Sequence, residues 1–319
     1  CQATDLFARG AVEILQKVGC DYLAFGCEDG DVAFFETAVI QRQAIENEIS
    51  RFVEENRSLT FASQLTLLAI KKFGEKSALA EALQSPNQQL GLAYAVENAN
   101  GKHPMQLVPI TRVGSGHLDD ALEETAFASG TALRKALKEN REDKVLRAQL
   151  SYVRFDEAEY QNDWSYYWPL LKSIILRSTD EDLRAIYQME EGIENRLKEA
   201  IRMTSSIEEC LQYLKNKRWS WARLQRVLVY VLLGITKEEM EDYWSRKIEQ
   251  GSVLGFTPKG QEWLKQMRVV DSFQLITNYA AYKDERQESW DLLYDYWNPS
   301  KQISATVFKP IQVNKEESF

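Results

Sequence analysis

One helix start in this chain carries the residue types that bind phosphate. Ser129, Gly130 and Thr131 form a small-residue turn with two hydroxyls, and Arg134 follows in the first turn of a helix expected over 131–140. A helix start exposes free backbone N–H groups and the positive end of the helix dipole, and an Arg side chain adds a planar fork of donors. The segment therefore suits a phosphate group. The alternative is ordinary helix capping, for which Ser and Thr are also preferred.

Three more candidate residues lie at the ends of expected elements. Gly26 and Arg112 each end a short, β-rich strand, and Asn87 lies in the first turn of a helix that Ser85 is expected to cap. Strands separated by helices indicate a parallel sheet, which binds ligands at the carboxyl ends of its strands. We therefore expect one edge of the sheet to gather Gly26, Asn87, Arg112 and the turn over 129–134.

The first part of the chain alternates helices with strands. The expected helices cover 5–18, 34–56, 60–73 and a stretch that begins at Ser85, and the expected strands cover 21–25 and 105–112. Thr4, Thr60 and Ser85 are the expected caps of three of these helices. The helix over 5–18, the stop at Gly19 and the strand over 21–25 form the back half of a βαβ unit. Because a strand should open such a unit, we expect a segment before Cys1 to be missing from this chain.

After about residue 144 the pattern becomes almost entirely helical. Expected helices cover 160–176, 179–188, 190–203, 207–216, 220–233 and 236–250, with one short helix after Pro258 and a possible edge strand over 305–313. Thr179 and Asp182 are expected to form a capping box. The sequence therefore predicts an α/β fold with a parallel sheet over residues 1–143, followed by a mostly α-helical domain over residues 144–319.

Composition limits the classes of protein that this chain can belong to. It has 319 residues, of which 39 are basic and 48 acidic, so its net charge of −9 excludes a globally basic nucleic-acid coat. No apolar run is long enough to span a membrane, the four cysteines are scattered, and His103 and His117 are the only histidines. We expect a cytoplasmic protein without membrane association and without a protein-bound metal site.

One window reverses the acidic character of the chain. Residues 211–226 contain no acid and five cations, which are Lys215, Lys217, Arg218, Arg223 and Arg226. Trp219 and Trp221 are interleaved with them, and helical spacing places Arg223, Arg226 and Tyr230 on one face that we expect to be exposed. Cations beside aromatic rings suit RNA, whose phosphates and unstacked bases they can contact. The alternative is a solvated helix face whose tryptophans belong to the core.

The ordered set of these motifs resembles the bacterial tRNA(Met) cytidine acetate ligase family of the nucleotidyltransferase superfamily. The motifs that carry the resemblance are Phe25-Gly26-Cys27-Glu28, Ser85-Pro86-Asn87, Ile110-Thr111-Arg112, Gly114-Ser115-Gly116-His117, Ala128-Ser129-Gly130-Thr131-Ala132-Leu133-Arg134 and Lys217-Arg218-Trp219-Ser220-Trp221-Ala222-Arg223. They span nearly the whole chain, and their order is far more specific than any one of them.

The resemblance implies an activity and a set of partners. That family activates acetate with ATP as acetyl-adenylate and acetylates N4 of the wobble cytidine of elongator tRNA(Met), with Mg²⁺ expected on the phosphates. The first domain would then be a partial Rossmann-like nucleotidyltransferase domain. The ATP-binding positions implied by the resemblance are Gly26, Asn87, Arg112, Ser129, Thr131 and Arg134. The basic window supplies the expected tRNA contacts, which are Lys217, Arg218, Arg223 and Arg226.

One family motif does not occur in this sequence. The family opens with a His-x-Gly-His motif that binds the ATP phosphates, and none of these 319 residues forms it. No catalytic residue is therefore assigned, and the chain is expected to be a shortened member or a fragment, with doubtful activity alone. Two alternatives stay open: a non-catalytic tRNA-binding relative, and a small-molecule adenylyltransferase of the same superfamily. The large helical domain and its basic window argue against the second alternative.

Overall fold

The computed structural model describes residues 2–28, 30–56, 58–112, 130–138, 164–190, 192–267, 273–278, 284–294 and 311–312. Its first part contains two strands and six helices before residue 112. In chain order these are α1 (Thr4–Lys17), β1 (Tyr22–Cys27), α2 (Val32–Ala44), α3 (Glu46–Glu55), α4 (Phe61–Phe73), α5 (Ala78–Ala82), α6 (Pro86–Asn100) and β2 (Gln106–Thr111). The expected boundary between two domains at residues 143 and 144 lies outside the described residues.

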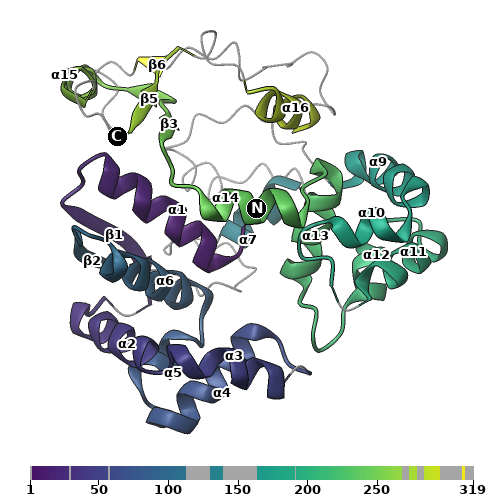
Figure 1. Ribbon diagram of the computed structural model, residues 1–319, viewed down its shortest axis with the longest axis horizontal. Coiled ribbons are helices and arrows are strands. Elements are labelled where there is room, and N and C mark those ends of the chain that lie inside the picture. The colour runs from purple at the N-terminus through teal and green to yellow at the C-terminus, as the bar shows by residue number, and fades with distance from the viewer. Residues whose placement is uncertain are drawn as a thin grey trace.

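The two first strands form a parallel pair, as the sequence predicts. Gly26 lies opposite Ile110 and Cys27 opposite Thr111, so both strands end at the same edge. Alternate residues of β1 face the core, and α1 and α6 pack against one another beside the sheet (Figure 1). On the other face Tyr22 and Ile110 are exposed. The helices therefore bury one face of this pair and leave its carboxyl-terminal edge accessible.

Two details of the first part differ from expectation. The single helix expected over 34–56 is two helices that meet at Ile45, where the backbone turns (φ −104°, ψ 2°) so that its side chain is buried. Thr4 lies inside α1, and Ala3 takes the capping position without a side-chain bond. In contrast, Thr60 and Ser85 cap α4 and α6 as predicted, because each hydroxyl accepts a bond from the backbone N–H three residues later.

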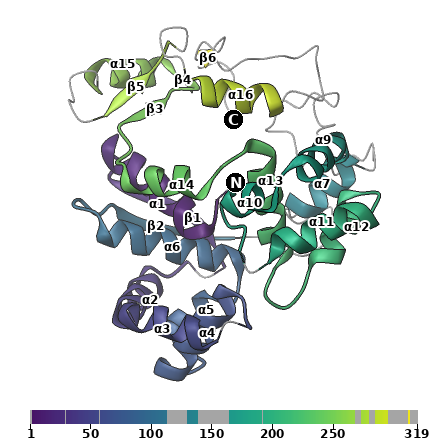
Figure 2. The same cartoon turned by 45° about the vertical axis from the view of Figure 1, so that its right-hand side comes forward.

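The second part begins with a bundle of helices. These are α7 (Gly130–Lys138), α9 (Trp164–Arg177), α10 (Asp180–Ala185), α11 (Ile193–Met203), α12 (Ile207–Leu214), α13 (Trp221–Leu233) and α14 (Lys237–Ser245). Helices α9 to α13 share an apolar core separate from that of the first part (Figure 2). Thr179 and Asp182 form the predicted capping box of α10, and Ser220 caps α13.

The end of the described chain contains short strands that the sequence pattern does not predict. They are β3 (Gln250–Ser252), β4 (Gly255–Phe256) and β5 (Gln274–Ile276), with α15 (Pro258–Met267) and α16 (Glu285–Tyr294) between and after them. The possible edge strand appears as β6 (Ile311–Gln312), which pairs with β4. Figure 1 places these elements on the side of α1 away from α2 to α5. No described helix is long and apolar enough to cross a lipid bilayer.

We predict that Gly91 is required for the close packing of α6 on the core. A Cβ at this position would lie 2.8 Å from Phe25 Cε2 and 2.9 Å from Phe35 Cε1, and those two rings already pack edge to face. Gly91→Ala should therefore lower the free energy of unfolding by about 1–2 kcal/mol, although Ala favours helix. The measurement is urea denaturation followed by circular dichroism.

Gly10→Ala is the matched control for this prediction. Gly10 is also inside a helix, but a Cβ there would meet only Ile248 Cδ1, at an ordinary contact distance of 3.9 Å. This control should be neutral or stabilising by up to about 1 kcal/mol. Equal effects of the two substitutions would show that the rings move aside at no cost.

Candidate functional site

The carboxyl-terminal edge of β1 and β2 brings three of the predicted residues together. Gly26 is the penultimate residue of β1, and the backbone N–H of Arg112 donates to the Cys27 carbonyl at 2.9 Å, which extends the strand pairing by one residue. A Cβ on Gly26 would lie 3.8 Å from Arg112 Cγ, so the Arg112 side chain crosses next to this glycine. Gly26 and Arg112 thus form one surface, as predicted.

Glu28 connects this surface to the start of α6. Ser85 Oγ donates to one Glu28 carboxylate oxygen at 2.7 Å, and Asn87 Nδ2 donates to the other at 2.9 Å. Ser85 Oγ also accepts the capping bond from the Gln88 backbone N–H. One carboxylate therefore holds Asn87 at the strand edge, beside Gly26 and Arg112.

The surroundings of Glu28 favour its charged form. Partial burial raises the pKa of Glu28, but bonds from Ser85, Asn87 and its own backbone N–H, together with the charge of Arg112, outweigh that effect. The pKa of Glu28 therefore lies below its usual value. At neutral pH the edge carries a fixed carboxylate next to a guanidinium, and the Asn87 amide oxygen accepts no bond within the described residues.

Sequence reasoning did not include Glu28 among the site residues. Its role depends on the pairing of β1 with β2 and on the position of α6. These bring Glu28 to Ser85 and Asn87, which lie 57 and 59 residues further along the chain. The available signal was its place directly after the strand that Gly26 was expected to end. A carboxylate at the carboxyl end of a parallel strand is a candidate ligand or positioning group on that ground alone.

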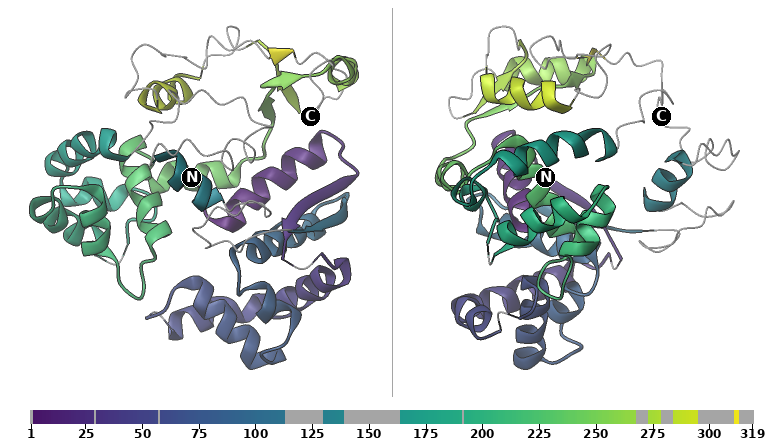
Figure 3. Two further views of the ribbon diagram at one scale, coloured as in Figure 1. Left: turned by 180° about the vertical axis from the view of Figure 1, so that it is seen from behind. Right: turned by 90° about the vertical axis from the view of Figure 1, so that its right-hand side faces the viewer.

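The predicted phosphate turn is only partly described. Ser129 lies outside the described residues, and so does the side chain of Thr131, whose backbone is in the first turn of α7. Arg134 Nη1 lies 3.2 Å from the position of a Cβ on Gly130, so the guanidinium folds back over the helix start. The right-hand view of Figure 3 shows α7 standing apart from β1 and β2.

The cations of the basic window differ in their exposure to solvent. Lys215 and Lys217 are exposed, whereas Arg218, Arg223 and Arg226 are half-buried. Arg223 pairs with Glu190 at 3.6 Å, and burial lowers the pKa of Arg226. The three arginines all line one cleft.

Tyr230 of α13 is not exposed as predicted, and Trp219, just before the helix, takes the alternative position in the core. Tyr230 is only 1% exposed, because its ring packs on Tyr187 at a centroid distance of 5.2 Å and its hydroxyl bonds to Gln2. It shares the face of Arg223 and Arg226, but the chain covers that face at this end of α13. Trp219 is 4% exposed in the helical core, so its ring is not available to an RNA base; Trp221 packs partly against the same core.

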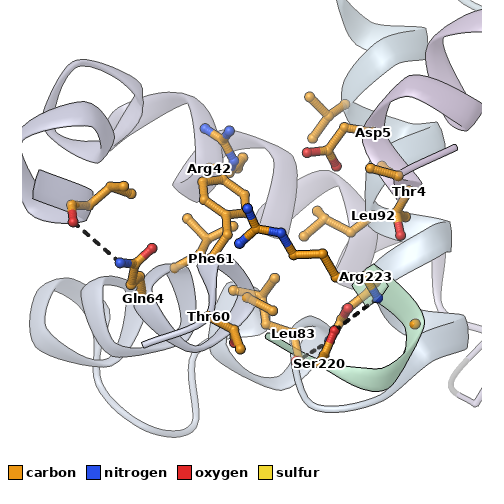
Figure 4. A pocket seen from close by; sticks show the side chains of 18 of the residues that line it. Thr4, Asp5, Arg42, Thr60, Phe61, Gln64, Leu83, Leu92, Ser220 and Arg223 are labelled. Atoms are coloured by element: carbon orange, nitrogen blue, oxygen red, sulfur yellow. Dashed lines mark hydrogen bonds between the residues drawn. The ribbon is translucent and has the colours of Figure 1, made fainter. Parts of the chain in front are cut away.

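The cleft beside the three arginines lies between the two halves of the chain. Its volume is about 1210 Å³, and its walls come from α1, α2, α3, α4 and α6 on one side and from residues 187–190 and α13 on the other. Figure 4 shows Arg223 extending from α13 toward the wall that carries Arg42 and Phe61. Arg42, which sequence reasoning missed, forms an ion pair with Glu46 one helical turn away.

We predict that the Ser85 hydroxyl stabilises both the start of α6 and the charged form of Glu28. Ser85→Ala should lower the free energy of unfolding by about 1 kcal/mol through the lost cap, and should raise the pKa of Glu28 toward its usual value. A group with a lowered folded-state pKa contributes stability above its unfolded pKa and loses it as the pH falls through the folded value. The effect of the substitution should therefore be larger at pH 7 than near pH 3.

Thr60→Ala provides the matched control, because Thr60 also caps a helix but, among the described residues, its hydroxyl contacts Ser63 and not a carboxylate. Its cost should be the same at both pH values. Chemical denaturation at each pH, with carbon-detected NMR titration of the Glu28 carboxyl, measures both effects. A Glu28 titration unchanged by Ser85→Ala would contradict the assignment.

Comparison with known proteins gives the family of the chain. The HIGH nucleotidyl transferase family matches residues 1–316. A curated relative from Lactobacillus acidophilus named tRNA(Met) cytidine acetate ligase is 34% identical over 272 residues, which are 84% of this chain and 68% of the relative. The relative of the same name from Bacillus subtilis is 30% identical over 294 residues, 88% of this chain and 70% of its own length.

Solved structures agree on the fold. The structure of Thermotoga maritima TmcAL without ligand matches with a TM-score of 0.83 at 21% identity, over 98% of this chain and 82% of that one. The TmcAL structure bound with alpha-thio ATP gives 0.80 at 22% identity, over 98% and 81% of the two chains. With the family match over nearly all its residues, the chain therefore belongs to the HIGH nucleotidyl transferase family and, within it, to the tRNA(Met) cytidine acetate ligases.

Proposed function

We propose that this chain supplies the nucleotide edge and the tRNA-binding helices of an ATP-dependent ligase that acetylates N4 of the wobble cytidine of elongator tRNA(Met). The observation that carries the proposal is the convergence of Gly26, Asn87 and Arg112 at one sheet edge. Parallel α/β folds bind nucleotides at this kind of edge. The curated relatives named for the same reaction support the choice of substrates.

In the proposed first step, ATP activates acetate. A carboxylate oxygen of acetate attacks the α-phosphorus, the bond to the bridging oxygen breaks, and pyrophosphate leaves with that electron pair. Such a transfer depends mainly on positioning and on neutralising charge. Arg112 would donate its fork to phosphate oxygens, and the Asn87 amide oxygen would accept from a ribose or adenine donor. Gly26 would leave room for the nucleotide, because it has no Cβ.

In the proposed second step, the amine of cytidine N4 attacks the acetyl carbon of the mixed anhydride. An amide forms, AMP leaves, and the amine loses one proton. The base has to leave its stack for this attack, so the enzyme has to hold both the backbone and the flipped base. Exposed Lys217, with the half-buried Arg218, Arg223 and Arg226, is proposed to hold that backbone.

The turn at the start of α7 is also proposed to bind the nucleotide. Ser129, Thr131 and Arg134 would bind the ATP phosphates at the start of α7. The fold of Arg134 over Gly130 supports this, because it places a guanidinium beside the helix start. For these residues to join the nucleotide at Arg112, α7 would have to approach the strand edge.

The described residues do not fit a protein-bound Mg²⁺ ion. No group of three or more His, Cys, Asp or Glu side chains in the described ranges could hold a metal, and both oxygens of Glu28 already accept hydrogen bonds. Mg²⁺ commonly binds through substrate phosphates, so we propose that any Mg²⁺ arrives with ATP.

We predict that Arg112 contributes directly to nucleotide affinity. Arg112→Ala should weaken ATP binding by about 1.5–3 kcal/mol, the value of hydrogen bonds to a charged group, while the melting temperature changes little because its side chain is exposed. Asn87→Ala should also weaken binding, and because it removes a bond to Glu28 it should lower the melting temperature slightly. Isothermal titration calorimetry with ATP and acetate measures both.

Arg177→Ala, at the exposed end of α9, removes the same charge far from the edge and serves as the control. If Arg112→Ala binds ATP as tightly as this control does, Arg112 does not belong to the nucleotide site.

We also predict that the arginines of α13 contact RNA phosphates. The double substitution Arg223→Ala and Arg226→Ala should weaken binding of tRNA(Met) and reduce the slope of log K against log salt by roughly one unit for each phosphate that the variant no longer binds. ATP affinity should be unchanged, because these side chains line the cleft and not the strand edge. The measurement is fluorescence anisotropy at several salt concentrations.

The matched control removes two exposed arginines of the same bundle, Arg177→Ala with Arg202→Ala. This control should keep the wild-type slope. An unchanged slope in the Arg223 and Arg226 variant, with its melting temperature preserved, would show that these two arginines do not contact RNA phosphates.

A further inference from the structure

Two buried polar atoms in the cleft have no hydrogen-bond partner in the part of the chain that the structure describes. One is the acceptor Oε1 of Gln188 and the other is the donor Nε of Arg226, and both residues line the cleft. Burying such atoms without a partner costs free energy comparable with a lost hydrogen bond. A ligand with one acceptor and one donor would satisfy both atoms.

The backbone of Gln188 is held in an unfavourable conformation. Its φ of 60° is the only positive value at a non-glycine residue among the described positions. The neighbours fix it there, because the Tyr187 N–H donates to the Ile235 carbonyl at 2.9 Å and the Met189 N–H donates to the Ile186 carbonyl at 3.1 Å. Strain of this kind persists where surrounding bonds impose it, commonly at ligand sites. The fold thus keeps Gln188 on the cleft wall.

The cleft can take a nucleobase beside the phosphates that its arginines are proposed to hold. Asp5 and Glu97 line the wall opposite α13, and burial raises the pKa of each carboxyl. That wall therefore suits a neutral base better than a second phosphate. Each base edge presents acceptors and donors, which an Arg fork and a Gln amide can contact, and Tyr187 and Phe61 supply rings.

The cleft adjoins the proposed nucleotide edge without being part of it. Leu83 and Gln89 line the cleft, and along the chain they flank Asn87. Of the described residues, neither Gly26, Asn87 nor Arg112 is part of the cleft lining. A base in the cleft would therefore lie near the start of α6, which carries Asn87.

We propose that the cleft binds a second unstacked base of the anticodon loop, adjacent to the acetylated cytidine, with Arg226 Nε donating to its edge and Gln188 Oε1 accepting from it. This inference rests on the proposed function. The bound base would select the tRNA, because only a loop with the correct neighbour could fill the cleft while the cytidine reaches the nucleotide edge.

The test combines protein variants with RNA lesions. The probe is a labelled anticodon stem-loop of elongator tRNA(Met), in which each loop base is removed in turn to leave an abasic site. Gln188→Asn withdraws the carbonyl by one methylene and tolerates positive φ, and Arg226→Lys keeps the charge but removes Nε. At one position next to the reactive cytidine, the abasic site should weaken binding to the wild-type chain about tenfold, but binding to either variant less than twofold.

Matched controls are Gln212→Asn and Arg202→Lys, which make the same changes on exposed positions of α12 and α11. Both should keep the tenfold effect. The inference would be overturned if every abasic site affected wild type and variants equally. It would also be overturned if the only site at which wild type and variants differ were the reactive cytidine itself. Failure of the intact stem-loop to bind the wild-type chain would instead overturn the proposed function.

Discussion

The site depends on the parallel pairing of β1 with β2. Because Gly26 lies opposite Ile110 and Cys27 opposite Thr111, both strands leave the sheet at one edge, and Arg112 begins where the pairing ends. An antiparallel pair would place the ends of the two strands at opposite edges. The helix directly before β2, α6, packs on β1 and α1 and has its start at the same edge, where Ser85 and Asn87 bond to Glu28. A shift of one residue in the register would turn Gly26 and Ile110 to opposite faces.

Glu28 shows how this edge combines positioning with charge. Its carboxylate holds Ser85 and Asn87, so it ties the start of α6 to the end of β1. The same negative charge lies near Arg112 and partly offsets the attraction of that guanidinium for phosphate. An edge built only to bind phosphate would not include such a group. The arrangement instead favours Asn87 as the contact to the uncharged part of a nucleotide, with Arg112 as the contact to phosphate.

Local signals in the sequence predicted most of this architecture. Capping residues such as Thr60, Ser85, Thr179 and Ser220 mark helix starts, because each satisfies backbone donors within its own turn. The parallel pair was predictable from two β-rich segments separated by helices. What could not be predicted depends on partners distant in the chain, as in the break at Ile45, which apolar periodicity does not reveal. The same limit applies to the site: topology alone could place Gly26, Glu28 and Arg112 at the edge, whereas the bonds by which Glu28 holds Ser85 and Asn87 depend on the position of α6. Tyr230 looks exposed on a helical wheel, but residues from elsewhere in the chain cover it.

The acidic character of the chain has a consequence for the proposed RNA complex. A net charge of −9 repels RNA at long range, and the acid-free basic window is the short stretch over residues 211–226. Phosphate contacts add affinity but do not distinguish one RNA sequence from another. A protein with few such contacts gains little affinity from them. A larger share of the binding free energy must then come from short-range contacts with bases. An acidic chain with a base-binding cleft would therefore bind other RNAs weakly and depend on the bases of the anticodon loop to retain its own substrate.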